Sequence, residues 1–260
     1  MALELSLVII TCNEAHNLPR CLASVAGLPD EVVVVDSGST DGTVELAREA
    51  GCKVIHHDWP GYGPQVTYAM EQASCPWLLR LDADEALSPA LRASLERWKA
   101  SDSSPFRAYR MLRRDWFYHR FLRATRDWFV RLGHRDAVKI NRSLVHETWQ
   151  TTEPIGRLDG YLDHYSVYLY AERMARLAKY SQLNGLENHQ RGKRFRWHQP
   201  FVNPVSIFLR TYLLEAGFLD GWPGFLYSAS FAHYIFAKYV TLWEYQAGHQ
   251  GQAAPVTEAH

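Results

Sequence analysis

Residues 31–42 read EVVVVDSGSTDG, an aliphatic run that ends in a short polar segment rich in glycine and hydroxyl side chains. Apolar residues follow one another from Val32 to Val35 without alternation, which is typical of a parallel strand buried on both faces. Residues 5–14, LSLVIITCNE, have nearly the same form. The two runs therefore predict two buried strands, each with polar residues directly after its carboxyl end.

Helical patterns separate these strands and continue the alternation toward the centre of the chain. Residues 14–25 place Leu18, Leu22 and Val25 on one helical face. The Ser-Thr-Asp segment at 39–41 supplies capping residues for a helix over 43–50. The elements expected next are a strand over 53–57, a helix over 64–73 and a strand over 76–81. This alternation predicts an α/β fold with a mostly parallel sheet and right-handed crossovers.

An acidic pair follows the fourth predicted strand, where residues 75–85 read CPWLLRLDADE. Asp82 and Asp84 are two residues apart, so their carboxylates point to the same mouth of the sheet and can share a divalent cation. Ligands of open α/β sheets bind outside the carboxyl ends of the strands. Thr11, Asn13 and Asp36 lie at two other such ends. We therefore expect one crevice, suited to a metal diphosphate.

Charge is distributed unevenly along the 260 residues, although the formal net charge is zero. Residues 1–104 contain 7 Lys and Arg against 15 Asp and Glu, whereas residues 105–145 contain 11 against 3. The second segment is also rich in aromatic residues, so it is suited to an acidic sugar phosphate, a membrane surface or nucleic acid. The alternative is that its arginines neutralise the acidic first segment within the fold. No nucleic-acid motif accompanies the block, and no nucleic-acid partner is expected.

The cysteines and the start of the chain bear on its compartment. The four cysteines show no CxxC spacing, which is typical of buried thiols in a reducing compartment. Residues 1–10 contain no basic segment and run directly into a strand, so no signal peptide is expected. We expect the protein to be cytoplasmic.

The last hundred residues predict helices. Residues 168–190 form a long helical pattern, residues 192–198 a basic linker, and residues 201–219 and 225–243 two apolar stretches. Neither stretch is a convincing membrane-spanning segment. One helical face contains apolar and aromatic side chains, and we expect it to lie in a membrane interface, with packing on the catalytic domain as the alternative. These residues are Phe225, Ala229, Ala232, Phe236, Tyr239 and Trp243.

The predicted organisation is thus an α/β domain over residues 1–166, a helical extension over 167–246 that we expect to associate with a membrane, and a disordered tail over 247–260. The chain contains, in this order, the segments VIITCNE at 8–14, VVVDSGSTDGT at 33–43, DWPGYGPQ at 58–65, LDADE at 81–85, RL at 131–132, LVHE at 144–147, LRTY at 209–212 and GFLDGW at 217–222. This ordered set resembles family-two glycosyltransferases of the GT-A fold, and more narrowly the bacterial lipopolysaccharide-core β-1,4-glucosyltransferases. The resemblance implies that residues 1–166 are the nucleotide-sugar-binding and catalytic domain. The chain differs from the family pattern at Gly133, where an aromatic is usual, and at Val66 and Thr67, where a basic residue is common.

The resemblance implies a GT-A, Rossmann-like sheet flanked by helices, and an inverting transfer of a hexose from a UDP-sugar. UDP-glucose is the implied donor, and the implied acceptor is a lipopolysaccharide or lipooligosaccharide core, with a polyprenyl-linked glycan as the alternative. The implied cofactor is Mg²⁺ or Mn²⁺, with Asp84 as the first ligand and Asp82 contacting either the metal or the ribose. His164 is a further metal or diphosphate contact, or a structural histidine.

The remaining roles divide among the nucleotide, the acceptor and the base. Thr11, Asn13 and Asp36 are expected to meet the base and ribose, unless they serve only turns and helix caps. Gln65, after the glycine turn at 61–63, is expected in the nucleotide pocket. Arg123 and Arg126 are expected to contact the acceptor. The predicted catalytic base is Glu147, with Glu85 and Asp163 as substitutes and a plain salt bridge with neighbouring arginines as the alternative.

Other classes fit the sequence less well. A dinucleotide-dependent oxidoreductase needs GxGxxG after the first strand, and a nucleotidyltransferase needs a glycine-rich loop there with a reactive basic residue, but residues 11–14 read TCNE. An aspartyl phosphatase needs Asp-x-Asp after the first strand, not the fourth. The non-enzymatic alternative is a peripheral membrane scaffold that retains the fold without its chemistry.

Overall fold

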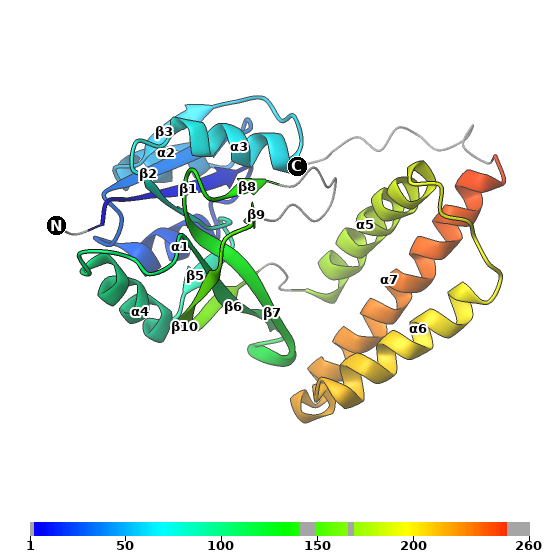
Figure 1. Ribbon diagram of the computed structural model, residues 1–260. Coiled ribbons are helices and arrows are strands. Elements are labelled where there is room, and N and C mark those ends of the chain that lie inside the picture. The colour runs from blue at the N-terminus through cyan, green and yellow to red at the C-terminus, as the bar shows by residue number, and fades with distance from the viewer. Residues whose placement is uncertain (1–2, 141–148, 166–168, 249–260) are drawn as a thin grey trace. The chain divides into compact units, whose positions relative to one another are not determined.

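The computed structural model describes residues 3–140, 149–165 and 169–248 (Figure 1). The chain divides into two compact units. The sheet unit contains residues 1–115 and 126–166, and the helical unit contains residues 116–125 and the residues from 167 onward. Residues 116–125 thus group with the C-terminal helices, although the sequence places them within the first domain.

One eight-stranded sheet forms the sheet unit, in the order β3-β2-β1-β4-β7-β6-β10-β5. β1 pairs in parallel with β2 and β4, and β2 pairs in parallel with β3. β7 is antiparallel to β4, β10 is parallel to β6, and β5 closes the far edge antiparallel to β10. The strands are β1 (Leu5–Thr11), β2 (Glu31–Asp36), β3 (Lys53–His56), β4 (Trp77–Arg80), β5 (Glu85–Leu87), β6 (Ala108–Phe117), β7 (Arg120–His134) and β10 (Ile155–His164), with β8 (Lys139–Ile140) and β9 (Trp149–Gln150) as a separate pair.

Helices cover both faces of this sheet. They are α1 (Leu18–Val25), α2 (Thr43–Glu49), α3 (Tyr62–Gln72) and α4 (Pro89–Lys99). α4 begins where the Ser88 hydroxyl accepts the Leu91 amide at 3.3 Å, a standard helix cap. The predicted α/β class, with a mostly parallel sheet and C-terminal helices, is confirmed.

Two apolar layers explain why the strand sequences do not alternate. Leu7 and Ile9 of β1 belong to one core cluster, on the side of α1 and α4. Val8 of the same strand belongs to a second cluster that includes Ala69 of α3. All three residues are almost completely buried. Because both faces of β1 are covered, consecutive apolar residues fill it from Leu7 to Ile10, and the buried Ser6 hydroxyl is satisfied by donating to Glu31 at 2.7 Å.

Three helices dominate the helical unit: α5 (Tyr170–Gln190), α6 (Gln199–Leu209) and α7 (Trp222–Gln246). Between α6 and α7 the chain makes a π-helical turn at Arg210–Leu214 and a 3-10 turn at Gly217–Asp220. α7 packs against both α5 and α6 (Figure 1). Gly185 of α5 permits close approach, because a Cβ there would lie 2.6 Å from Thr241 Cγ2 of α7.

The tip of the β6–β7 hairpin belongs to the helical unit because its side chains are buried there. The turn residues Tyr118 and His119 have φ angles of 46° and 62°, as a tight two-residue hairpin turn requires. Phe117 and Leu122 are buried against residues of α5 and α7. The Arg123 amide donates to Asp220 Oδ2 at 2.7 Å, which fixes the tip to the 3-10 turn.

In the described part of the chain, no helix has both the length and the apolar composition needed to cross a bilayer. The apolar stripe expected on α7 is half-buried over most of its length, because α7 is the helix that packs against both others. Only Phe236 and Trp243 of that stripe are exposed. From residue 249 onward, the tail expected after Gln246 lies outside the described residues.

Candidate active site

The carboxyl ends of β1 and β2 meet through a direct contact between two predicted site residues. Thr11 and Asp36 are opposite each other in the parallel register, and the Thr11 hydroxyl donates to Asp36 Oδ1 at 3.1 Å. Asp36 Oδ2 accepts the amides of Gly38 and Ser39 at 2.8 and 2.9 Å, and Oδ1 also accepts the Ser39 hydroxyl. Asp36 therefore closes the turn after β2, which is the capping role weighed against nucleotide binding. Its role toward a nucleotide stays a prediction.

Asn13 and Gln65 also organise loops at the same edge of the sheet. Asn13 has a left-handed φ of 55°, and its Oδ1 accepts the Thr40 amide at 2.9 Å. Gln65 is fully buried, and its Nε2 donates to Ser37 Oγ at 2.9 Å while its Oε1 lies 2.7 Å from His57 Nδ1. Gln65 thus ties α3 to the loops that follow β2 and β3. Contact of either side chain with a nucleotide also stays a prediction.

Asp82 is held by two arginines. Its Oδ1 lies 3.1 Å from Arg80 Nη2, and its Oδ2 accepts Arg131 Nη2 at 2.8 Å. Burial alone would raise the pKa of Asp82, but the charges of Arg131 and then Arg80 outweigh it and hold that pKa well below its usual value. Asp82 is therefore ionised, and both of its oxygens face guanidinium groups.

Arg131 also neutralises a carboxylate that is completely buried. Arg131 Nη2 lies 2.6 Å from Glu85 Oε1, and the other carboxylate oxygen of Glu85 accepts the Asp82 amide at 3.0 Å. Burial raises the pKa of Glu85 although Arg131 opposes the rise, and the negative charge of Asp82 adds to it. Arg131 reaches this position from β7 because Leu132 lies beside Leu79 of β4. Sequence reasoning did not name Arg131 as a site residue, and the only signal was its place in the family resemblance.

Asp84 and His164 form the second contact of the acidic segment. His164 lies opposite Glu85 of β5 and Asp115 of β6 in the sheet register. Its Nε2 is 3.3 Å from Asp84 Oδ2, and its Nδ1 is 2.8 Å from Asp115 Oδ1. Burial would lower the pKa of His164, but Asp84 and then Asp115 raise it to about 10. With no cation bound, the ring is an imidazolium between two carboxylates at neutral pH.

These atoms fit a divalent cation with few protein ligands. The 3.3 Å between Asp84 Oδ2 and His164 Nε2 can be bridged by an ion with bonds of about 2.1 Å. Within residues 3–140, 149–165 and 169–248, no three His, Cys, Asp or Glu side chains are grouped as a metal site. Of the three predicted metal ligands, Asp84 and His164 lie next to each other, whereas Asp82 pairs with two arginines. Among the described residues, Asp84 and His164 are therefore the pair that could hold a cation, and this role stays a prediction.

The other predicted residues are in different situations. Asp163 makes a double contact with Arg114, at 2.5 and 3.2 Å, so this substitute base is paired. Arg126 lies over the Tyr161 ring at 5.8 Å in the sheet unit, whereas Arg123 belongs to the helical unit. Glu147, the predicted base, falls within residues 141–148 and lies outside the described residues.

Much of the basic block has partners within the fold. Arg107 pairs with Glu153 at 2.9 Å, and Arg135 donates to the backbone carbonyls of residues 73 and 75. These contacts, with those of Arg114 and Arg131, favour the interpretation in which the arginines neutralise and brace the fold. The departure at Gly133 has a packing reason, because a Cβ there would collide with Val138.

Comparison with known proteins identifies the family of the chain. The model of the glycosyl transferase family 2 matches residues 6–148. The lipopolysaccharide core biosynthesis glycosyltransferase LpsC of Rhizobium meliloti (strain 1021) is 32% identical over 257 residues, covering 94% of this chain and 94% of LpsC. An uncharacterized glycosyltransferase of Rickettsia typhi is 30% identical over 254 residues, covering 92% of this chain and 85% of the relative.

A solved structure shares the fold over nearly the whole chain. The mannosyltransferase PcManGT from Pyrobaculum calidifontis, solved in complex with GDP-Man and Mn²⁺, superposes with a TM-score of 0.55 at 15% identity. The match covers 94% of this chain and 88% of that one. The GT-A fold expected from the resemblance is confirmed, and the chain belongs to glycosyl transferase family 2.

Proposed function

We propose that this glycosyltransferase transfers a hexose, with glucose from UDP-glucose as the donor, to a lipopolysaccharide or lipooligosaccharide core in an inverting, metal-dependent reaction. The observation that supports it most is the Asp84–His164 pair at the carboxyl edge of the sheet, 3.3 Å apart and beside the arginine-held Asp82. The name of the LpsC relative supports the acceptor class.

Residues at this edge of the sheet are suited to form a binding site for a nucleoside diphosphate. Asp84 and His164 would hold Mg²⁺ or Mn²⁺, which supplies charge neutralisation for the departing diphosphate. Asp115 fixes the orientation of the His164 ring through Nδ1, so that Nε2 faces Asp84. Asp82 is held rigidly by Arg80 and Arg131, which suits it to bind the ribose at a fixed position.

The nucleotide base and ribose are assigned to the neighbouring strand ends. Thr11, Asn13 and Asp36 would line this part of the site with their backbone and remaining polar edges, because their side-chain oxygens already close the turns. Gln65 would support the pocket wall from α3. Preformed turns of this kind reduce the ordering cost of binding a nucleotide.

For the base we retain Glu147. Glu85 is completely buried and paired with Arg131, and Asp163 is paired with Arg114, so neither is suited to remove a proton from an acceptor hydroxyl. The conservative variant Glu147→Gln should lower kcat by at least 100-fold, on the order of a lost general base, while UDP binding is unchanged. A variant with nearly full kcat would remove this assignment.

Isothermal titration with UDP tests the metal-dependent site. The protein should bind UDP in the presence of Mn²⁺ or Mg²⁺, and Asp84→Asn should lose the part of the affinity that depends on the cation. Asp159→Asn is the matched control, because Asp159 is an exposed carboxylate on the strand that supplies His164. The proposal would be contradicted if UDP binding did not depend on the cation, or if both variants lost UDP affinity equally.

Donor and acceptor need a separate experiment. Metal-dependent hydrolysis of a panel of UDP-sugars, with GDP-mannose for comparison because PcManGT was solved with it, would identify the donor. The polyprenyl-linked glycan remains the alternative acceptor, and a non-catalytic membrane scaffold the alternative function. Absence of hydrolysis with every sugar, together with absence of UDP binding, would favour the scaffold.

We place the reaction at the cytoplasmic face of the inner membrane, with the protein bound peripherally. A lipid-linked acceptor requires the enzyme to meet a bilayer surface.

A further inference from the structure

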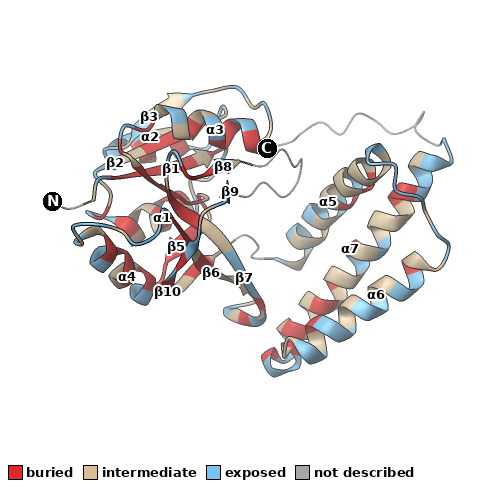
Figure 2. Cartoon of the chain, in the orientation of Figure 1, coloured by how far each residue is buried: buried red, intermediate tan, exposed pale blue. Residues whose placement is uncertain are grey.

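The helical unit exposes an apolar surface along α6 and the turns that follow it (Figure 2). Trp197, Phe201, Leu214 and Trp222 are 76%, 65%, 84% and 67% exposed. The other members are 47–58% exposed and comprise Val202, Val205, Leu209, Leu213, Phe218 and Leu219. We call these ten residues the α6 surface. Its three most exposed aromatics, Trp197, Phe201 and Trp222, alone leave on the order of 400 Å² in contact with water, about the size of the largest patch on a typical soluble monomer.

The α6 surface is the outer side of a helix whose inner side is already packed. Pro200 and Thr211 are buried against the rest of the helical unit, whereas Phe201, Val205 and Leu209 recur at intervals of four and lie along the opposite side. A helix that is apolar all round is normally covered on all sides. Within the described residues of the helical unit, nothing covers the outer side of α6, so a further partner is expected.

The charges directly before the α6 surface are basic. Residues 191–196 contain four basic side chains and no Asp or Glu, and all four are exposed: Arg191, Lys193, Arg194 and Arg196. Further along the surface Arg210 is a fifth basic residue, and it pairs with Glu215 at 2.8 Å. Anionic membranes attract such clusters by about 1 kcal/mol for each basic residue near the surface. Two copies of the chain would instead bring like charges together on this face.

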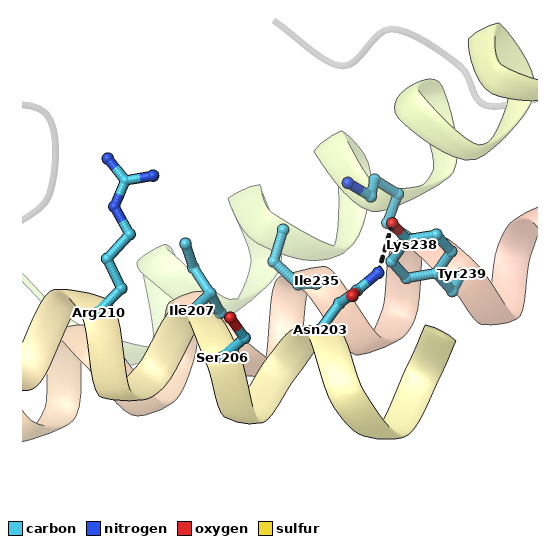
Figure 3. Close-up of a pocket in the computed structure, with 7 residues that line it drawn as sticks. All are labelled: Asn203, Ser206, Ile207, Arg210, Ile235, Lys238 and Tyr239. Carbon is cyan, nitrogen blue, oxygen red and sulfur yellow. Dashed lines mark hydrogen bonds between the residues drawn. The ribbon is translucent and has the colours of Figure 1, made fainter. Parts of the chain in front are cut away.

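A groove between α6 and α7 adds a place for an anionic group at the edge of the same surface. Its volume is about 220 Å³, and Figure 3 shows the cationic ends of Arg210 and Lys238 extending on the same side of it. Asn203 donates to the Tyr239 hydroxyl at 2.7 Å along its wall. Among the described residues no carboxylate pairs with Lys238, and burial, followed by the charge of Lys193, lowers the pKa of Lys238. An anion here would gain the attraction of an uncompensated cation.

We propose that the α6 surface docks the protein on an anionic phospholipid bilayer, with the apolar side chains at the boundary of the acyl chains and one lipid phosphate in the groove at Arg210 and Lys238. The geometry is that of an interfacial amphipathic helix, with apolar residues outermost and basic residues at the level of the headgroups. This inference deepens the proposed function in one respect, since it supplies the contact that a lipid-linked acceptor requires.

Flotation of the full chain with vesicles tests the proposal without any substrate. The protein should float at low salt with vesicles that contain phosphatidylglycerol, and much less with phosphatidylcholine alone. The double variant Phe201→Ser/Trp222→Ser should lower the partition coefficient at least about tenfold. Lys238→Gln should lower it about fivefold on anionic vesicles and little on neutral ones.

Two matched variants control for general effects. Phe236→Ser removes an exposed aromatic from α7 outside the α6 surface, and Arg48→Gln removes an exposed charge from α2 in the sheet unit. Both should float like the parent protein. Equal losses in the controls, or no flotation of the parent protein, would overturn the proposal. So would a dimer that only the Phe201→Ser/Trp222→Ser variant dissociates, because the face would then bind a second copy.

Two further measurements identify the bound group and separate this inference from the enzymatic one. Inorganic phosphate that protects Lys238 from acylation but does not compete with vesicles would assign the groove to a free anion and overturn the lipid assignment. UDP titration in the presence of Mn²⁺ should be unchanged in the docking variants. A protein that floats with vesicles but does not bind UDP would count against the proposed function alone. A protein that binds UDP but does not float would count against the docking surface alone.

Discussion

Replacing Arg131 with Met should destabilise the sheet unit more than any exposed charge change. Arg131 Nη2 is 2.6 Å from Glu85 Oε1 and 2.8 Å from Asp82 Oδ2, and the Glu85 side chain has no exposure to water. Removing one partner of a buried pair leaves an uncompensated charge, and this costs about 3–5 kcal/mol. We expect about 3 kcal/mol, because Asp82 is partly exposed and keeps Arg80, and Glu85 keeps Arg113 at 4.0 Å.

Urea unfolding followed by far-UV circular dichroism measures this change, and hydrogen exchange of the peptide over residues 77–87 places it in the sheet unit. The matched control is Arg191→Met, which removes an exposed arginine from an i,i+4 helix pair with Glu187 and should cost about 0.3–0.5 kcal/mol. The double variant Arg131→Met/Glu85→Gln should be more stable than Arg131→Met alone, because it removes the stranded charge as well as its counterion.

The pH dependence supplies an independent check with a definite sign. Without Arg131, burial would raise the folded-state pKa of Glu85 further above its unfolded value. Above that pKa the ionised carboxylate lowers the free energy of unfolding of the variant. As the pH falls and the carboxyl takes up a proton, this loss of stability is recovered. The difference in unfolding free energy between Arg131→Met and the parent protein should therefore shrink as the pH falls from above the raised folded-state pKa of Glu85 toward the usual range of a glutamate. A loss below about 1 kcal/mol that is also independent of pH would refute the reasoning.

Three other outcomes are expected. Gly133→Ala should lower stability by about 1–3 kcal/mol because its Cβ collides with Val138, and Val138→Ala in the same chain should restore part of it in thermal unfolding. Burial and nearby carboxylates raise the pKa of the Cys21 thiol well above its usual value, so Cys21 should resist a disulfide reagent at neutral pH in the native protein and react after unfolding, when all four thiols are counted. Arg123→Gln and Arg126→Gln should raise the KM for the acceptor more than the KM for the donor, and equal effects on both would remove the acceptor assignment.

The sequence predicted β1, β2 and β4 because these strands are largely buried, whereas the edge strand β3 was predicted from its place in the β-α alternation. β1 and β2 contain the uninterrupted apolar runs Leu7–Ile10 and Val32–Val35, and the polar segments that follow these runs mark the carboxyl ends directly. The later strands lack this signal. β6 and β7 alternate arginines with aromatic and aliphatic residues, so they resemble a basic surface segment, and β10 pairs with β6 from more than forty residues away. Such pairings depend on the assembled sheet and are not local.

The candidate site was predictable to the same extent. Asp82 and Asp84 could be placed together from spacing alone, because a strand ends just before them. The role of Arg131 could not be predicted from the sequence, because it depends on the strand register in which Leu132 lies beside Leu79. On the helical side, periodicity pointed to α7 as the membrane helix, although α7 lies against two neighbours and α6 against one. Apolar content identifies a helix that must be covered, and only the assembled fold shows which side remains open.

Asp82 and Asp84 are chemically identical and two residues apart, yet one faces two guanidinium groups and the other faces an imidazole. If a cation binds between Asp84 and His164, Asp84→Asn should remove only the cation-dependent part of UDP affinity. Asp82→Asn should instead weaken UDP binding with and without the cation, because it disturbs the arginines that fix this edge of the site. Identical losses in the two variants would place Asp82 among the metal ligands, since only a shared ion would couple the two carboxylates in that way.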